Sequence, residues 1–262
     1  MMAVSNTLNI CLGHVPFPIE YREYVDLMIA PNLVAGPYRV AVVPDSLFGP
    51  NGSALSEYAQ LLWLSDNFDA ITSGVDFVRI FHYRRFASGK PLPGVASTNQ
   101  PWSTTITAGA LANCGKEFDR LCSAELFNRP TRFAGGVLKQ YAAAHVLEDI
   151  LSFVKFLLEI HVFEPVHADA FLDVETLIPA CNIGTFRNET LRSLLLLLKR
   201  AADFMKSSYF VPREGYQRRN MGFLLERLHS FAILQRVQSR MSPPNFGHNI
   251  VISESPIVSL TI

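Results

Sequence analysis

Four consecutive residues, His82-Tyr83-Arg84-Arg85, follow a short apolar run and form the densest chemical signal in the chain. Successive residues that leave a strand point to opposite sides, so His82 and Arg84 are expected on one side and Tyr83 and Arg85 on the other. Adjacent guanidinium groups suit a diphosphate, because each donates two parallel hydrogen bonds to oxygens of fixed geometry. The alternative is a structural arginine pair that is buried against carboxylates.

A second group of arginines, Arg213, Arg218 and Arg219, precedes a stretch of helical spacing that contains Glu226. Arginines do not favour the positive end of a helix dipole, so their position there indicates a role other than capping. Glu226 is a candidate general base for an acceptor hydroxyl. It could instead pair with one of these arginines and hold the site in shape, and we favour that structural role.

Metal binding has little support in the sequence. No Asp-x-Asp occurs, and the nearest candidates, His167 with Asp169 and Asp66 with Asp69, are interpreted as surface polar groups. The local signatures of hydrolases, kinases and dinucleotide-binding proteins are also missing: there is no Gly-x-Ser-x-Gly, no Walker loop and no Gly-x-Gly-x-x-Gly. We therefore expect no cofactor, although a divalent metal is compatible with the chain.

The hydrophobic pattern predicts the elements that position these residues. Short apolar runs that end at Gly, Pro or polar residues predict strands at residues 8–12, 38–43 and 77–81. His14 follows the first of these strands and His82 the third, and ligands of open α/β sheets bind beyond strand ends of this kind. Helical spacing over residues 53–67 predicts a helix that carries Glu57.

The later part of the chain is predicted to be rich in helices. Residues 87–115 contain much Gly, Pro, Ser and Thr, which indicates a long loop or flap. The pattern predicts one helix or a pair at 137–161, further helices at 189–206 and 221–236, and strands at 177–183 and 249–253. We expect a mixed α/β fold in a single domain, residues 1–262, with a sheet part, a loop-rich flap, a helical part and a tail: 8–86, 87–136, 137–240 and 241–262.

Composition excludes several classes of function. The 262 residues are 49% hydrophobic, and 23 Lys and Arg balance 23 Asp and Glu to a net charge of zero. Such a chain can bury a large core but has no global basic field, so nucleic acid is disfavoured as a partner. No apolar run approaches the roughly 20 residues of a membrane-spanning helix. A soluble or peripheral protein is expected, and peripheral membrane association is compatible with the apolar composition.

The cysteines and the N-terminus point to the cytoplasm. Cys11, Cys114, Cys122 and Cys181 form neither a Cys-x-x-Cys knuckle nor the dense framework of a secreted scaffold. Residues 1–9 carry no Lys or Arg before an apolar run that polar residues interrupt, so they do not form a secretory signal.

The motifs of the chain resemble a bacterial family of capsule and exopolysaccharide glycosyltransferases, long catalogued as a domain of unknown function. The most specific match is His82-Tyr83-Arg84-Arg85 followed by an aromatic residue. The other matching positions follow in the family's order over roughly residues 8 to 235: His14, Glu57, Trp63, Asn67, Gln140, Tyr141, His145, Asn182, Glu189, Arg219, Gly222, Phe223, Glu226, Arg227 and Leu228.

The chain also departs from the family's pattern. An Asp-Asn-x-Gly-Asp-Asn-Ile-Ser loop is reduced here to Asp45 and residues 49–53, and a Met-Phe pair after Asn182 is replaced by Ile183-Gly184. The second Trp of the family's first helix is lost. These changes concern the identity of the donor or the acceptor. They also leave open the interpretation that the chain is a divergent or inactive member of the family.

The resemblance implies transfer of a sugar from a nucleotide-sugar donor to a saccharide or lipid-linked acceptor, on a GT-A-like nucleotide-binding sheet with a helical acceptor side. The expected donor-binding residues are His14, His82, Tyr83, Arg84, Arg85, Asn182 and Arg219. The candidate bases are Glu57, Asp45 and Glu226. Arg84 or Arg85 would neutralise the charge that grows on the departing diphosphate, as a divalent ion does in metal-dependent relatives. Activity lost to a chelator and restored by manganese would contradict this metal-free hypothesis.

Two other interpretations stay open. A noncatalytic partner of a polysaccharide assembly complex, which binds a nucleotide or a carbohydrate, is favoured by the altered loop at residues 45–53. A phosphate-handling hydrolase is weaker, because no nucleophile or metal cage is visible.

Overall fold

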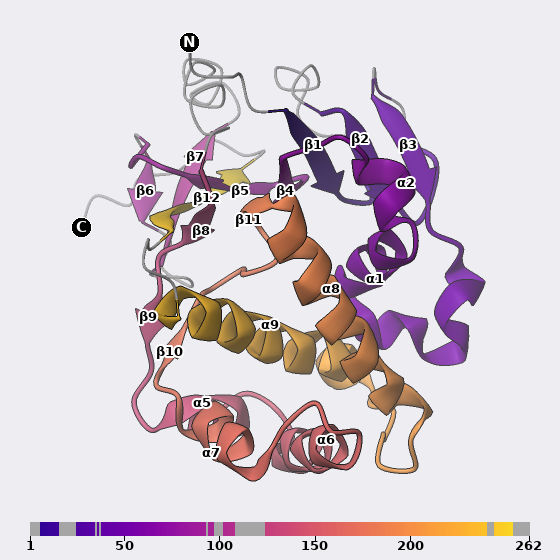
Figure 1. Cartoon of the computed structure of the whole chain (residues 1–262), viewed down its shortest axis with the longest axis vertical. Helices are drawn as coiled ribbons and strands as arrows, with labels where there is room; N and C mark the ends of the chain where they lie inside the picture. Colours follow the sequence, from indigo (N-terminus) through magenta and orange to yellow (C-terminus); the bar gives the residue numbers. More distant parts are fainter. Residues whose placement is uncertain are drawn as a thin grey trace.

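The computed structural model describes residues 6–15, 25–34, 36, 38–92, 94–96, 102–107, 124–239 and 244–253. Its upper half in Figure 1 is a mixed sheet, and its lower half is helical. The long helix α9 (Asn220–Gln238) crosses between the sheet and the helices α5 (Gly136–Ala142), α6 (Leu147–Glu159) and α7 (Pro165–Asp173). No helix in these described ranges is long and apolar enough to cross a membrane.

The first four strands form a parallel unit. They are β1 (Thr7–Leu12), β2 (Leu27–Ala30), β3 (Arg39–Val42) and β4 (Phe77–His82), in the spatial order β3-β2-β1-β4. Along the chain, β2 and β3 are therefore added on one side of β1, and β4 is then added on its other side. It makes this crossing through the 3-10 segment η2 (Asp45–Leu55) and the helices α1 (Tyr58–Asp66) and α2 (Phe68–Thr72). The strand order thus reverses between β1 and β4, which is the position where open α/β sheets bind ligands.

The remaining strands extend the same sheet beyond β4. Strand β11 (Gly184–Arg187) runs antiparallel to β4 and is followed by β8 (Leu126–Asn128), β12 (Asn245–Ser253), β7 (Ser103–Thr107) and β6 (Val95–Ala96). Strand β5 (Arg85–Ser88) pairs with both β12 and β4. A strand from the end of the described chain is thus inserted between strands that precede the helical half. A separate two-stranded ribbon joins β9 (Thr131–Arg132) to β10 (Thr176–Leu177).

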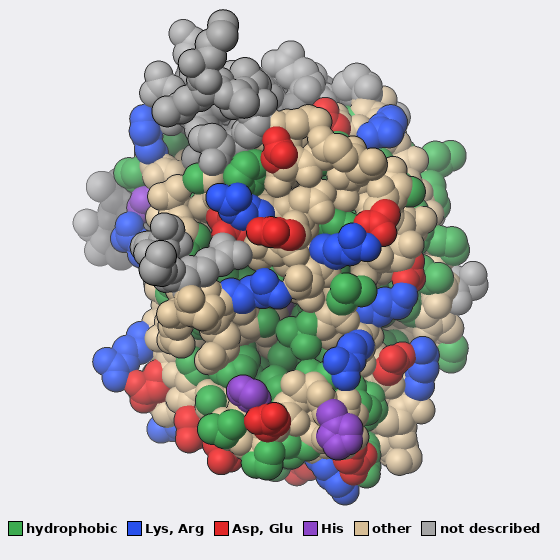
Figure 2. Space-filling view, viewed as in Figure 1, with side chains coloured by type: hydrophobic (Ala, Val, Ile, Leu, Met, Phe, Trp, Pro, Cys, Tyr) green, Lys and Arg blue, Asp and Glu red, His purple; other side chains and the backbone are tan. Residues whose placement is uncertain are grey.

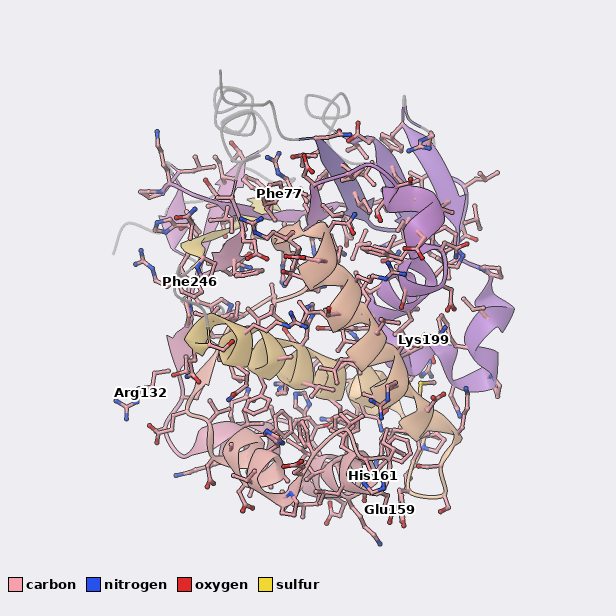
Figure 3. All side chains as sticks on the ribbon, in the orientation of Figure 1. Phe77, Arg132, Glu159, His161, Lys199 and Phe246 are labelled. Atoms are coloured by element: carbon pink, nitrogen blue, oxygen red, sulfur yellow. The ribbon has the colours of Figure 1, made fainter. Side chains whose placement is uncertain are left out.

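One hydrophobic core joins the two halves. Alternate residues of β1, including Ile10 and Leu12, pack toward the helices, while Cys11 packs in a smaller cluster on the opposite face of the sheet. Helix α9 is central, since 13 of its 19 residues are buried, and α8 (Asn188–Ala202) packs against it and α1. Side chains fill the space between α9 and the α5–α7 layer (Figure 3).

Most elements expected from the sequence are confirmed. The strands at 8–12, 38–43, 77–81 and 249–253 correspond to β1, β3, β4 and β12, and the stretch 137–161 forms the pair α5 and α6. The helices at 189–206 and 221–236 correspond to α8, which continues into η3 (Asp203–Lys206), and to α9. The mixed α/β class with a helix-rich second half is therefore confirmed.

Two expected elements need correction. The helix at 53–67 begins as α-helix only at Tyr58, because Ser56 has a left-handed backbone with φ of 52°. The strand at 177–183 is wrong, since Ala180 has φ of 47° and the carbonyls of Pro179 and Ala180 accept hydrogen bonds from the Asn128 amide. The loop at 87–115 contains strands β5, β6 and β7, and residues 108–115 lie outside the described residues.

Gly222 sets the distance between α9 and the turn that ends η2. A Cβ atom added at Gly222 would lie 2.9 Å from the carbonyl oxygen of Leu55 and 3.3 Å from Cβ of Ser56. Backbone atoms cannot move aside as a flexible side chain can, so α9 approaches this turn so closely only because residue 222 lacks a side chain.

We predict that Gly222→Ala destabilises the protein, although Ala is the better helix former by about 1 kcal/mol. The clash with Leu55 should outweigh that gain and lower the free energy of unfolding by about 1–3 kcal/mol. Urea unfolding measures the change, and Gln235→Ala, at an exposed site on the same helix, is the control that should stay within about 0.5 kcal/mol of the wild type. A Gly222→Ala protein more stable than the wild type would contradict the proposed close contact.

Candidate functional site

The candidate site begins where the strand order reverses. Gly13 and His14 follow β1, and His82 is the last residue of β4. These three residues therefore meet at one edge of the sheet. Gln60 of α1 ties this edge to the crossover helix, because its Nε2 donates a 3.1 Å hydrogen bond to the carbonyl oxygen of Gly13. The His14 and Tyr83 rings contact each other edge to face, with centroids 4.8 Å apart.

Two adjoining cavities open from this edge. The first, here called the strand-end cavity, has a volume of about 590 Å³ and lies between the ends of β1 to β4 and η2. The second, the helical cavity, has a volume of about 400 Å³ and lies between the end of β4, α9 and the loop after α5. The two cavities share five lining residues: Ser56, Glu57, His82, Arg84 and Arg219. A group bound in one cavity would therefore lie next to a group bound in the other.

Glu57 is the carboxylate at the junction, and three neighbours hold it. Ser56 Oγ donates a hydrogen bond to Glu57 Oε2, and the Arg219 guanidinium donates to Ser56 Oγ at 2.7 Å and to Glu57 Oε2 at 3.3 Å. His82 Nε2 lies 3.6 Å from Glu57 Oε1. Burial raises the pKa of Glu57, but the hydrogen bonds and the positive charge of Arg219 outweigh it, so the net pKa is lowered. Glu57 is thus an ionised carboxylate, and 32% of its side chain is exposed to the cavities.

His82 is buried and neutral. Only 7% of its side chain is exposed, and burial together with Arg85 and Arg84 lowers its pKa to about 3, even though Glu57 acts in the opposite direction. Its Nδ1 is buried and has no hydrogen-bond partner among the residues that the structure describes. Burial without a partner is costly for a ring nitrogen, which is typical of a position kept for a function.

Arg84 and Arg85 do not form the expected extended pair. β4 continues through His82 and turns at Tyr83-Arg84 into β5, with His82 paired to Arg85 across the hairpin. The predicted alternation of the four side chains is therefore wrong, because it assumed a continuing strand. Tyr83 lines the strand-end cavity, Arg85 lines the helical cavity, and His82 and Arg84 line both.

Neither Arg84 nor Arg85 has a carboxylate partner in the part of the chain that the structure describes. Arg84 is exposed and lies over the Tyr83 ring at 5.5 Å. Arg85 is half-buried, and burial and the charge of Arg84 lower its pKa. These described residues therefore do not form a structural arginine pair that is buried against carboxylates. Glu57 and Glu226 act on Arg85 only at longer range. Two adjacent guanidinium groups without a close carboxylate among the described residues make a site that an anion would stabilise.

The second arginine group divides into three roles. Arg213 donates hydrogen bonds of 2.8 and 3.2 Å to Asp149, whose side chain is 4% exposed, so this arginine is structural. Arg218 is exposed and lines neither cavity. Arg219 lines both cavities, and its guanidinium lies 5.6 Å from the centroid of the Phe223 ring.

The other expected site residues are dispersed. Asn182 and Glu226 line the helical cavity. Glu226 lies 3.3 Å from Arg227, which is itself buried and donates to Gln140 Oε1 at 3.1 and 3.2 Å. This pairing is with Arg227, not with the arginines before the helix. Asp45 begins η2, and its side chain lies outside the described residues.

The candidate metal pairs form surface contacts instead. Asp69 pairs with Arg192 at 2.7 Å, Asp66 pairs with Lys199, and His167 Nδ1 accepts from the backbone N–H of Glu164 at 3.4 Å. Within the described ranges, no group of three or more His, Cys, Asp and Glu side chains could hold a metal ion. Charges of both signs are mixed over the face in Figure 2.

Sequence reasoning missed several residues that line the cavities. Ser56 and Gln60 have no local signature, because their roles depend on a left-handed turn and on a contact with a distant loop. A further set of aromatic side chains lines the helical cavity: Trp102, Phe133, His145, Tyr216 and Phe223. His145 and Phe223 were visible as motif positions, but nothing in the sequence assigned them a role.

We predict that stability falls between pH 6.5 and 5 because of buried histidines. Burial lowers the pKa of His82 and of His229, in the core, to about 3, so the unfolded chain binds a proton at each below pH 6.5 while the folded chain does not. The free energy of unfolding should drop by about 2 kcal/mol per histidine over this range. His229→Gln should remove one such contribution in urea unfolding at several pH values. His167→Gln, at an exposed site, should keep the wild-type dependence of the free energy of unfolding on pH. An unchanged pH dependence in His229→Gln would refute the lowered pKa of His229.

Comparisons with known proteins bear on the fold. No protein-family model matches the chain, and no curated protein matches it. A solved structure described as "WbbM bifunctional glycosytransferase apo structure" is similar, with a TM-score of 0.74 and 13% sequence identity over 97% of this chain and 48% of that one. The chain thus spans about half the length of the matched protein. At this identity the likeness shows that the chain has a glycosyltransferase-like fold.

Proposed function

We propose that the chain is a glycosyltransferase that moves a sugar from a nucleotide-sugar donor to an acceptor hydroxyl, on a sheet of the GT-A type. The observation that carries the proposal is the junction of the two cavities. There an ionised Glu57 pairs with Arg219 and shares the junction with Arg84, which has no carboxylate partner among the described residues, at the point where the strand order reverses. The similarity in fold to a bifunctional glycosyltransferase supports the same class of reaction.

The strand-end cavity has the features that a nucleotide sugar needs. Arg84 and Arg219 line it at the junction, where they would bind the diphosphate. Val43, Phe48 and prolines also line it, and such apolar side chains suit the flat face of a nucleobase. The exposed His14 and the half-buried Tyr83 line the same cavity and would contact the sugar or the ribose.

Glu57 would act as the base in the transfer step. It accepts the proton of the acceptor hydroxyl, whose oxygen forms a bond to the anomeric carbon of the donor sugar. The bond from that carbon to the diphosphate breaks, and its electron pair stays on the diphosphate oxygen. Arg84 and Arg219, which line the strand-end cavity, stabilise this new negative charge, which is the part that a divalent ion plays in metal-dependent enzymes. Glu57 is preferred over Glu226 because only Glu57 lines both cavities.

Membership of the capsule and exopolysaccharide family is part of the proposal. The motif residues Gln140, His145, Gly222, Phe223 and Arg227 meet around one cavity although they come from separate segments, which supports a shared site. A cytoplasmic enzyme of surface polysaccharide synthesis, acting near a membrane-bound acceptor, is the corresponding role.

A noncatalytic nucleotide-binding partner is the second candidate. The altered segment at residues 49–53 contributes Gly49, Pro50, Gly52 and Ser53 to the strand-end cavity, where a donor would lie. A protein that binds a sugar nucleotide but never releases the sugar would fit this candidate better than an enzyme.

We predict that Arg84→Ala removes at least about half of the stabilisation given by nucleoside diphosphates. A thermal-shift panel of nucleoside diphosphates and their sugar nucleotides should contain at least one that raises the Tm of the wild type, because a ligand at 100 times its Kd adds about 2.7 kcal/mol. Loss of one charge-assisted contact should weaken binding by at least about tenfold. Arg218→Ala, an exposed arginine outside both cavities, should keep the full shift. Equal shifts in the wild type and Arg84→Ala would exclude the diphosphate site.

We predict that Glu57→Gln lowers turnover by about 10²–10⁴ without loss of donor binding, since the amide cannot accept the proton. The measurement is release of nucleoside diphosphate from the sugar nucleotide that gives the largest thermal shift. Glu148→Gln, at an exposed site outside both cavities, is the control and should retain full activity. Full activity in Glu57→Gln would remove it as the base, and binding without any turnover in the wild type would favour the noncatalytic candidate.

A further inference from the structure

The helical cavity has an aromatic wall that the transfer step does not require. The rings of His145 and Phe223 stack with centroids 4.1 Å apart and an interplanar angle of 26°, and Tyr216 lies against Phe223 at 5.2 Å and 34°. Trp102 and Phe133 form a second pair with centroids 6.2 Å apart. All five side chains line the cavity. They come from separate segments between residues 102 and 223, so the fold gathers them at this place.

The outermost ring of the stack is open. Tyr216 is 65% exposed although it lines the cavity, whereas Phe223 beneath it is buried. An exposed aromatic face on a rigid support is a platform for a flat apolar surface of a ligand. His145 is fixed within the support: its Nδ1 lies 3.2 Å from Gln217 Oε1 and its Nε2 lies 3.5 Å from Arg227. Burial and the charge of Arg227 lower the pKa of His145 to about 4, so the support is neutral near pH 7.

Polar side chains face the same cavity. Asn182 offers both a donor and an acceptor, and Glu226, 38% exposed and anchored by Arg227, offers carboxylate oxygens. A hexose has an apolar face of C–H groups and an edge of hydroxyls, which matches an aromatic platform beside such groups. An alkyl chain would instead exclude water from Glu226, Asn182 and Arg85 without replacing the hydrogen bonds to that water, at a high cost in desolvation. The combination of an aromatic wall and hydroxyl-binding groups therefore favours a sugar over a lipid tail.

We propose that the helical cavity binds the terminal sugar of a saccharide acceptor, which stacks on Tyr216 and presents a hydroxyl to Glu57. The inference rests on the proposed function, because it identifies the acceptor of that same site. A sugar in the helical cavity would lie next to the proposed base, because Glu57 and Arg219 line both cavities and the Arg219 guanidinium lies over the Phe223 ring. Tyr216, Trp102, Asn182 and Glu226 are then acceptor-binding residues.

The test is direct binding of simple sugars, which does not depend on turnover. Saturation-transfer NMR is recorded for the methyl α- and β-glycosides of glucose, galactose and mannose, with and without the nucleoside diphosphate that gives the largest thermal shift. We expect at least one glycoside to bind the wild type and to bind at least tenfold more weakly to Tyr216→Ala. Tyr216 is exposed enough for this variant to fold. Tyr209→Ala, which removes a ring outside both cavities, is the matched control and should bind normally.

The outcomes separate this inference from the proposed function. No binding of any glycoside under either condition, or undiminished binding by Tyr216→Ala, overturns the sugar subsite. Binding of octyl glucoside but of no methyl glycoside also overturns it, in favour of a lipid tail. Glycoside binding that depends on Tyr216, in a protein whose nucleotide shift survives Arg84→Ala, supports the subsite while the diphosphate site fails. Trp102→Ala provides a second variant, expected to weaken the same glycoside.

Discussion

The carboxylate of Glu57, held between Arg219 and His82, is the contact on which the arrangement of the site depends. His82 belongs to the sheet, Arg219 to the segment before α9, and Glu57 to the turn that joins η2 to α1. The three residues therefore fix the sheet, the crossover and the helical half in one position. Gly222 makes this possible, because a side chain there would hold α9 away from the turn. The two cavities share this junction as a consequence.

The distribution of charge explains how a chain with zero net charge can hold an anion. Acidic and basic residues are equal in number, yet several pairs cancel each other at the surface, as Asp69 does with Arg192 and Glu175 with Arg132. Arg84 and Arg85 remain without carboxylate partners among the described residues. The positive potential is therefore local and not global. A bound diphosphate would interact mainly with the nearest guanidinium groups, because salt screens charges that lie farther away than about 8–10 Å.

The sequence predicted the elements better than their connections. Runs of apolar residues predicted β1, β3, β4 and the long helices, because burial on one or both faces of an element gives a characteristic spacing of apolar residues in the sequence. It did not reveal β2 or β8, which are only four and three residues long, nor the insertion of β12 beside β8, because strand pairing depends on contacts between distant segments. The residues after β1 and β4 were found because they follow apolar runs. Ser56, Gln60 and Tyr216 were missed because only tertiary contacts give them a role.

Several departures from ordinary local rules lie at the two cavities. Ser56 has a left-handed backbone without being Gly, and among the described residues Gln60 Oε1, His82 Nδ1 and Arg85 Nε are buried and have no hydrogen-bond partner. Each such feature costs about 1–3 kcal/mol, and a fold under no functional constraint would lose them by substitution. The side chains that carry these features line the cavities in which we place the donor and the acceptor. Polar groups held in fixed positions stabilise a developing charge without reorganising, so the cost of these features fits the proposed transfer step.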